Sequence, residues 1–79
     1  MTAYKVEKDA TGKCHIFKRE NDGSFRKISD SNGEVHTSGG TYKAEKKGEI
    51  CCVYLHEKSP GGNNETVTYI MKQGEIKTM

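Results

Sequence analysis

The chain contains six cysteine and histidine side chains of the types that bind transition metals. They are Cys14, His15, His36, Cys51, Cys52 and His56. A structural zinc site needs about four such ligands converging on one ion, with pairs of ligands close in sequence. No C-x-x-C-like or H-x-x-x-H-like pair occurs, and Cys52 and His56 would lie ~13 Å apart along a strand. We therefore expect packing or surface roles for these residues, with no metal site and no cofactor.

Arrangements that support covalent or acid–base catalysis are also hard to find. Cys14 and His15 are neighbours in sequence, but consecutive side chains on a strand point to opposite faces, so they would not form a nucleophile–base pair. No serine lies in a G-x-S-x-G turn, and the glycine-rich segment 38–41 is not followed by the helix of a phosphate-binding loop. The acidic residues considered for acid–base work occur where hydrophilic loops are expected: Glu7, Asp9, Glu20 and Asp22. We expect that the protein is not an enzyme.

Three cysteines are too few for a complete disulfide framework, because one must remain unpaired. Cys51 and Cys52 point to opposite faces if they lie on a strand, so they are poor partners for each other. A bond from Cys14 to either of them is an alternative, but we expect reduced thiols and a cytoplasmic location. The first ten residues contain no apolar signal-peptide region, and no stretch approaches the ~18–20 apolar residues of a membrane span. A membrane is therefore not an expected partner.

Length and composition indicate one small domain with a thin core, spanning residues 1–79. Apolar residues make up 32% of the chain, and its net charge is +2. The positive charge is concentrated in residues 1–28, which carry seven basic and four acidic side chains, a net +3. This bias is too weak to identify a partner by itself.

Turn-forming residues recur at short intervals, which predicts an all-β domain of about six to eight short antiparallel strands. Glycine-containing reversals occur at 9–12, 21–23, 31–33, 38–40, 47–48, 59–64 and 73–74. Alternating or apolar runs between them predict strands at 3–8, 13–19, 24–29, 34–37, 41–46, 49–57, 65–72 and 75–78. A hairpin meander, a small barrel and a curled sheet all fit this pattern. A short helix at 41–47 is an alternative, because Ala44, Glu45, Lys46 and Lys47 favour helices.

The most apolar run, 50–55, predicts a central strand covered on both faces. Residues 66–71 are nearly as rich in β-branched and aromatic side chains. We expect these two strands to pair across the loop that contains Pro60. The shorter, lysine-rich strands suit exposed sheet edges.

The function that these features favour is non-catalytic binding of another protein, or self-association, with a dimer as one form. Exposed strand edges can accept a strand from a partner, and tyrosines suit interfaces because each has an apolar ring and a polar tip. The candidate protein-binding residues are Tyr4, Tyr42, Tyr54 and Tyr69.

Nucleic-acid binding by the N-terminal third is the alternative. Small β-barrels bind nucleic acids by stacking bases on aromatic rings and neutralising phosphates with cations. The basic residues interleave with Tyr4, His15, Phe17 and Phe25. The candidate nucleic-acid-binding residues are Lys5, Lys13, Lys18, Arg19, Arg26 and Lys27.

Overall fold

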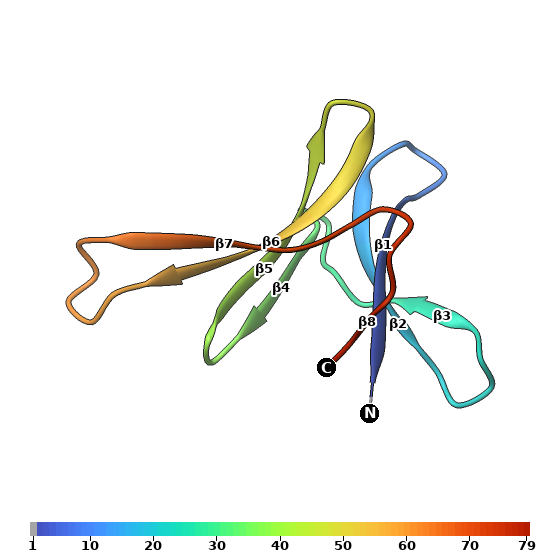
Figure 1. Ribbon diagram of the computed structural model, residues 1–79, viewed down its shortest axis with the longest axis horizontal. Helices are drawn as coiled ribbons and strands as arrows, with labels where there is room; N and C mark the ends of the chain where they lie inside the picture. Colours follow the sequence, from blue (N-terminus) through green and yellow to red (C-terminus); the bar gives the residue numbers. More distant parts are fainter. Residues whose placement is uncertain (1) are drawn as a thin grey trace.

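The computed structural model describes residues 2–79, which form eight β-strands and no helix. The strands are β1 (Ala3–Lys8), β2 (Cys14–Arg19), β3 (Phe25–Lys27), β4 (Glu34–Thr37), β5 (Gly40–Lys47), β6 (Ile50–Lys58), β7 (Glu65–Lys72) and β8 (Lys77–Thr78). The first sheet has the order β3-β2-β1-β8 and the second sheet the order β4-β5-β6-β7 (Figure 1). All neighbouring strands are antiparallel. The predicted all-β class is confirmed.

Aspartates at the start of two connections explain why the chain reverses where the sequence predicts. Asp9 Oδ1 accepts hydrogen bonds from the backbone N–H groups of Thr11 and Lys13, at 2.9 and 3.0 Å. Asp30 Oδ1 accepts two backbone N–H groups in the same way, at 2.9 and 3.0 Å. Each reversal ends at a glycine with positive φ, namely Gly12 and Gly33, which costs glycine little. Local side-chain chemistry therefore fixes these turns.

The helix considered for residues 41–47 is wrong, because these residues form most of β5. β5 pairs with β4 over its first half, Gly40 to Lys43, and with β6 from Thr41 to Lys47. Tyr42 and Ala44 face the core, whereas Lys43 and Glu45 face away from it, so the segment has the two-residue period of a strand. Pairing on both sides outweighs the weak helical propensity of the sequence.

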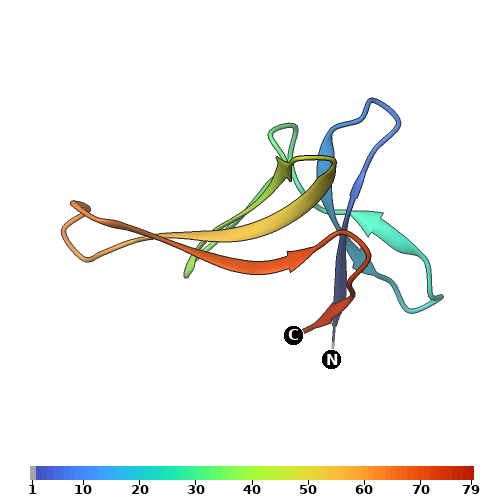
Figure 2. The ribbon, with the colours of Figure 1, turned by 45° about the horizontal axis from the view of Figure 1, so that its top comes forward.

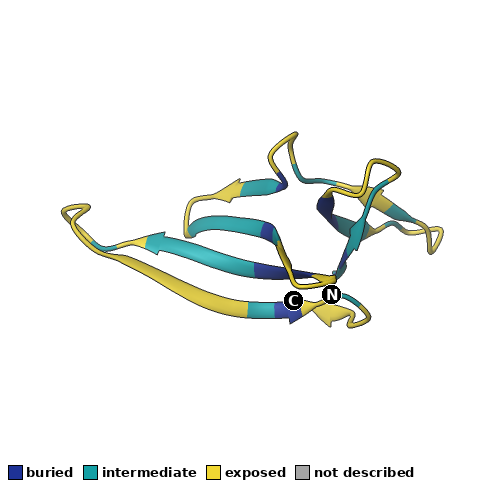
Figure 3. Ribbon diagram, turned by 90° about the horizontal axis from the view of Figure 1, so that it is seen from above, coloured by how far each residue is buried: buried dark blue, intermediate teal, exposed yellow. Residues whose placement is uncertain are grey.

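The core lies between the two sheets at one end of the second sheet. The face of each sheet that packs against the other is called its inner face, and the opposite face its outer face. The buried cluster on the inner faces comprises Val6, Cys14, Ile16, Ala44, Cys51, Val53 and Met71. Figure 3 shows these buried segments where the sheets meet, with exposed chain on either side. The core is small, as the composition predicts.

A disulfide between Cys14 on β2 and Cys51 on β6 joins the two sheets covalently, so the expectation of reduced thiols is wrong. Cys51 shares the inner face with Val53, while Cys52 is free and buried on the other side of β6. Strand alternation therefore selects Cys51 over its neighbour as the partner of Cys14. Disulfides persist mainly in oxidising compartments, which removes the reason for expecting a cytoplasmic location. Within residues 2–79, no helix has the length and hydropathy needed to cross a bilayer.

The β6–β7 hairpin continues well beyond the core, and its outer part, residues 54–69, is called the arm. The predicted pairing of β6 with β7 across the Pro60 loop is confirmed. Val53 pairs with Met71 and Tyr54 pairs with Tyr69, which leaves Ile70 without a partner in a β-bulge. Bulges bend strands, and the arm leaves the body of the molecule at this point. Figures 1 and 2 show it extending away from the first sheet.

Candidate functional site

The four candidate tyrosines do not form one surface. Tyr4 on β1 and Tyr42 on β5 lie on the inner faces and line the groove between the sheets. Tyr54 on β6 and Tyr69 on β7 lie opposite each other on the outer face of the second sheet. The structure therefore offers two separate candidate binding surfaces, each containing two of the predicted residues.

The inter-sheet groove is a mainly apolar cavity of about 260 Å³. It is lined by Tyr4, Ile16, Ile28, Val35, Thr37, Tyr42, Val53, Ile70, Met71 and Met79. Pockets for drug-sized ligands typically measure ~300–1,000 Å³. The groove is slightly smaller than this range, and several of its lining residues also belong to the core or pack against it.

The tyrosine pair on the outer face is held in a defined geometry. The ring centroids of Tyr54 and Tyr69 are 5.9 Å apart, and the rings meet edge to face at 68°. The Lys47 ammonium lies 5.2 Å from the centroid of the Tyr54 ring. The Tyr69 hydroxyl donates a hydrogen bond to Glu75, and partial loss of water together with this carboxylate raises the pKa of Tyr69. The Tyr69 ring is therefore ordered although 51% of the residue is exposed.

Beside this pair lies the open edge of the second sheet. Among the described residues, 2–79, β7 is the terminal strand of its sheet and is hydrogen-bonded only to β6. Its eight residues make it longer than the other edge strands, which have three residues in β3, two in β8 and four in β4. β7 contains no proline or glycine, and its charged residues, Glu65 and Lys72, are at its ends. Apart from the bulge at Ile70, it therefore lacks the features that usually protect an edge from other strands.

The chain closes the C-terminal end of this edge itself. The Gln73 backbone N–H donates to Cys51 on β6, so the preceding N–H, that of Lys72, points away from the sheet. The Lys72 N–H donates to Glu75 Oε1 at 2.9 Å, and the Glu75 N–H donates to the Lys72 carbonyl at 3.1 Å. The open part of the edge is therefore the arm portion of β7, from Glu65 to Tyr69, where every residue is exposed (Figure 3).

An ion-pair bridge ties the three longest strands together across the outer face. His56 on β6 lies with Nε2 2.8 Å from Glu45 Oε2 on β5 and with Nδ1 2.7 Å from Glu65 Oε1 on β7. Both ring nitrogens can donate to carboxylates only in the imidazolium form. The hydrogen bonds to Glu65 and then to Glu45 raise the pKa of His56 above its ordinary value. The bridge holds the Glu65 end of β7, far from the core, to the rest of its sheet.

The six candidate nucleic-acid-binding cations are divided between surfaces. Cross-strand pairing puts Lys5, Arg19 and Lys27 on the outer face of the first sheet, and Lys18 and Arg26 on its inner face. Lys13 lies in the turn before β2. Half the predicted set therefore shares one surface.

Phe17 and Phe25 lie on that same outer face, where Lys5 covers them. The Lys5 ammonium is 4.4 Å from the centroid of the Phe25 ring and 5.8 Å from that of Phe17. It also pairs with Glu7 at 3.1 Å, and Lys27 lies 3.8 Å from Asp9. A base could stack on these rings only after Lys5 moves aside.

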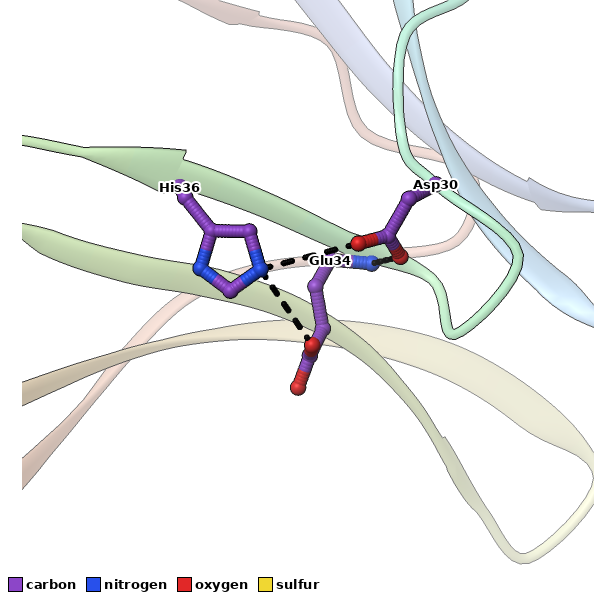
Figure 4. Close-up of side chains that lie close together, drawn as sticks. All are labelled: Asp30, Glu34 and His36. Carbon is purple, nitrogen blue, oxygen red and sulfur yellow. Dashed lines mark hydrogen bonds and ion pairs between the residues drawn. The ribbon is translucent and has the colours of Figure 1, made fainter.

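The cysteines and histidines considered as metal ligands are dispersed. Cys14 and Cys51 are oxidised, and His56 is engaged by Glu45 and Glu65. His36 takes part in a different cluster, in which its Nε2 lies 3.6 Å from Asp30 Oδ2 and 3.5 Å from Glu34 Oε1 (Figure 4). The ligand atoms of these three residues are within 4.8 Å of one another, and His36 and Asp30 are exposed. Turn capping and ion pairing account for this arrangement.

One hydrogen-bonded chain was not foreseen from the sequence. His15 is 4% exposed, with Nδ1 2.6 Å from Ser29 Oγ and Nε2 3.2 Å from Asp9 Oδ2. Ser29 Oγ also accepts the backbone N–H of Ile16 at 3.1 Å. The serine–histidine–aspartate order resembles a catalytic relay, but the imidazole is buried and none of the three residues lines the groove. The chain of bonds ties the β1–β2 turn to the β3–β4 connection.

The Asp9 carboxylate that pairs with His15 is held in its ionised form. The Thr11 hydroxyl donates to Asp9 Oδ1 at 2.6 Å, and with the backbone donors it lowers the pKa of Asp9 to about 2. Asp9 therefore remains an acceptor for His15 over the whole neutral range. The Asp9 carboxylate accepts hydrogen bonds from its own turn and lies beside the His15 imidazole. This supports a structural role for Asp9, His15 and Ser29 in positioning the β1–β2 turn.

Comparison with known proteins identifies no relative of this chain. No protein-family model, no curated protein and no solved structure matches it. Its surfaces are therefore the basis on which a function can be inferred. Of these, the open edge of β7 combines unpaired backbone, exposed apolar side chains and one of the predicted tyrosines.

Proposed function

We propose that the protein binds another polypeptide chain by accepting it as an additional strand along the edge of β7. The observation that carries this proposal is the exposed segment of this edge strand, Glu65 to Tyr69, which among the described residues is paired on one side only. An added strand gains main-chain hydrogen bonds from such an edge and specificity from alternate side chains. The inter-sheet groove is a weaker candidate, because its walls also form the core.

Two exposed apolar side chains favour this edge. Val67 and Tyr69 are each 51% exposed and lie on the same face of β7, next to Tyr54. A strand added here would cover both and would extend the surface formed by the two tyrosines. Cross-strand pairs of aromatic and β-branched side chains each contribute roughly 0.2–1 kcal/mol to a sheet.

The proposal is tested by selecting extended peptides from a random displayed library with the intact, disulfide-bonded protein. Selected peptides are then titrated into isotopically labelled protein, and the backbone amide shifts are followed by NMR. We expect the largest shifts between Glu65 and Tyr69, because the peptide forms its hydrogen bonds there. A selection that yields no binders, or shifts centred on Tyr4 and Tyr42 in the groove, would count against the edge.

A matched pair of variants separates the edge from general surface hydrophobicity. Val67→Lys places a charge on β7 and should weaken peptide binding at least tenfold. Ile50→Lys makes the same kind of change at an exposed residue that pairs with Lys47, at the end of β6 remote from the open part of β7. It should leave binding unchanged, and equal losses in the two variants would contradict binding at β7.

The second candidate function is nucleic-acid binding by the outer face of the first sheet. The observation that favours it is the placement of Lys5, Arg19 and Lys27 beside Phe17 and Phe25. Mobility-shift experiments with mixed single- and double-stranded pools at two salt concentrations test it. Electrostatic binding should weaken steeply as salt increases, and no shift at low salt would eliminate this candidate.

A further inference from the structure

We propose that the strand added to β7 is β7 of a second copy of this chain, paired antiparallel about a two-fold axis at Thr68. This inference rests on the proposed function and names the partner. The same open edge is available on every copy, so two edges can satisfy each other without any other protein. The result would be one continuous sheet of eight strands, four from each copy.

The pattern of exposed side chains selects the position of the axis. A two-fold axis perpendicular to the sheet keeps each face on its own side, so the residue at the axis pairs with itself. With the axis at Thr68, Val67 lies opposite the second copy's Tyr69, and Tyr69 lies opposite the second copy's Val67. These are the apolar residues that β7 leaves most exposed, at 51% each. Both contacts are of the favourable aromatic–β-branched kind.

Neighbouring registers are less complementary. With the axis at Val67, each Tyr69 would lie opposite Glu65 of the second copy. With the axis at Thr66, each Val67 would lie opposite Glu65 of the second copy. Both registers put a carboxylate against an apolar side chain, so that one of the two exposed apolar residues has no apolar partner. Of these three registers, the Thr68 register alone matches apolar with apolar at both positions.

The shape of the molecule leaves room for this pairing. The open portion of β7 belongs to the arm, which extends beyond the body, and in the part of the chain that the structure describes no other strand lies along its free side (Figures 1 and 2). The bodies of the two copies would therefore sit at opposite ends of the joined arms. The ring of Tyr69 is already fixed by Tyr54 and Glu75, so pairing has little side-chain entropy to remove there.

Two single-cysteine variants test the register directly. In the Thr68 register, the two copies of Thr68 face each other with Cβ atoms ~4.5–5.5 Å apart, close to disulfide distance. Thr66 is a matched control, since it is the same residue type, is also exposed and shares the face of Thr68. Its two copies would be displaced by four residues, ~13 Å along the strands. Under mild oxidation, Thr68→Cys should form a covalent dimer at least tenfold faster than Thr66→Cys.

Analytical ultracentrifugation provides the second readout. The wild-type protein should show a concentration-dependent monomer–dimer equilibrium, Val67→Lys should be monomeric, and Ile50→Lys should dimerise like the wild type. A wild type that stays monomeric at millimolar concentration overturns the homotypic partner. Equal cross-linking of Thr66→Cys and Thr68→Cys overturns the register. If the protein is monomeric but selected peptides still bind β7, strand addition stands with a different partner, whereas loss of both refutes the proposed function.

Discussion

Tyr69 packs edge to face against Tyr54, with the ring centroids 5.9 Å apart, on the outer face of the sheet that has β7 as its open edge. Such aromatic pairs contribute ~0.5–1.5 kcal/mol beyond the area that they bury. The contact fixes the Tyr69 ring while leaving half of the residue exposed. The exposed edge is therefore ordered before a partner arrives, which reduces the entropic cost of binding.

Removing the inter-sheet disulfide should strongly destabilise the fold. Cys14 and Cys51 are 37 residues apart, and loop-closure entropy for that separation corresponds to about 4 kcal/mol. The double variant Cys14→Ala, Cys51→Ala should lose about that free energy of unfolding in urea denaturation. Cys52→Ala is the control, because Cys52 is buried but unpaired. Equal losses in the two proteins would mean that the bond contributes nothing beyond packing.

The bridge from His56 to Glu65 and Glu45 predicts that the stability of the folded protein depends on pH. The pKa of His56 is raised in the folded protein, so its contribution is complete below its unfolded pKa of ~6.5. That contribution, about 1 kcal/mol or less for a partly exposed pair, is lost as the pH rises through the folded pKa. Thermal denaturation should show wild-type stability falling relative to His56→Gln as the pH rises above the unfolded pKa of ~6.5. Parallel profiles for the two proteins would contradict the bridge.

Two glycines in equivalent turns should respond differently to substitution. Gly12 and Gly33 both have positive φ, of +85° and +77°. A Cβ on Gly33 would lie 2.9 Å from the Cys14 carbonyl oxygen, whereas none of the surrounding atoms lies within 4 Å of a Cβ on Gly12. Gly12→Ala should cost the left-handed strain alone, ~1–2 kcal/mol, and Gly33→Ala at least ~1 kcal/mol more. Chemical denaturation measures both, and equal costs would contradict the close approach of the β3–β4 turn to β2.

β7 should tolerate substitution along the arm but not at its base. Met71 is 2% exposed and belongs to the core, so Met71→Ala should cost about 2–5 kcal/mol of stability. Val67 lies on the same strand but is exposed, so Val67→Ala should change the stability of the monomer by no more than ~0.5 kcal/mol. Urea denaturation at a concentration too low for association compares them. A large loss for Val67→Ala would mean that the arm is part of the cooperative core.

Much of the fold can be predicted from the sequence because its determinants are local. Aspartate–glycine turns and two-residue alternation place all eight strands, and the two most β-prone runs pair as expected. Residues 41–47 mislead in isolation, since their strand conformation depends on partners on both sides. Cys51 could have been preferred over Cys52, because it shares the alternation of Val53. The Cys14–Cys51 disulfide also requires that β2 and β6 lie close together. Their proximity depends on how the two sheets stack, which no local sequence pattern encodes.

The candidate site is less accessible to sequence reasoning. Tyr69 is predicted as a binding residue, but Tyr4 and Tyr42 fall in a groove and Tyr54 supports Tyr69. Which strands become sheet edges is a property of the whole topology, so the exposure of β7 could not be read from its own residues. The division of the cations between faces, in contrast, follows from strand alternation once the register is known.

The most direct test of strand addition is backbone amide hydrogen exchange along β7, measured by NMR at low protein concentration and again at a concentration where partners bind. Strand addition predicts that outward-facing amides between Glu65 and Tyr69 exchange rapidly in the monomer and become protected by at least tenfold on association. Protection that develops around the inter-sheet groove while these amides continue to exchange freely would contradict it.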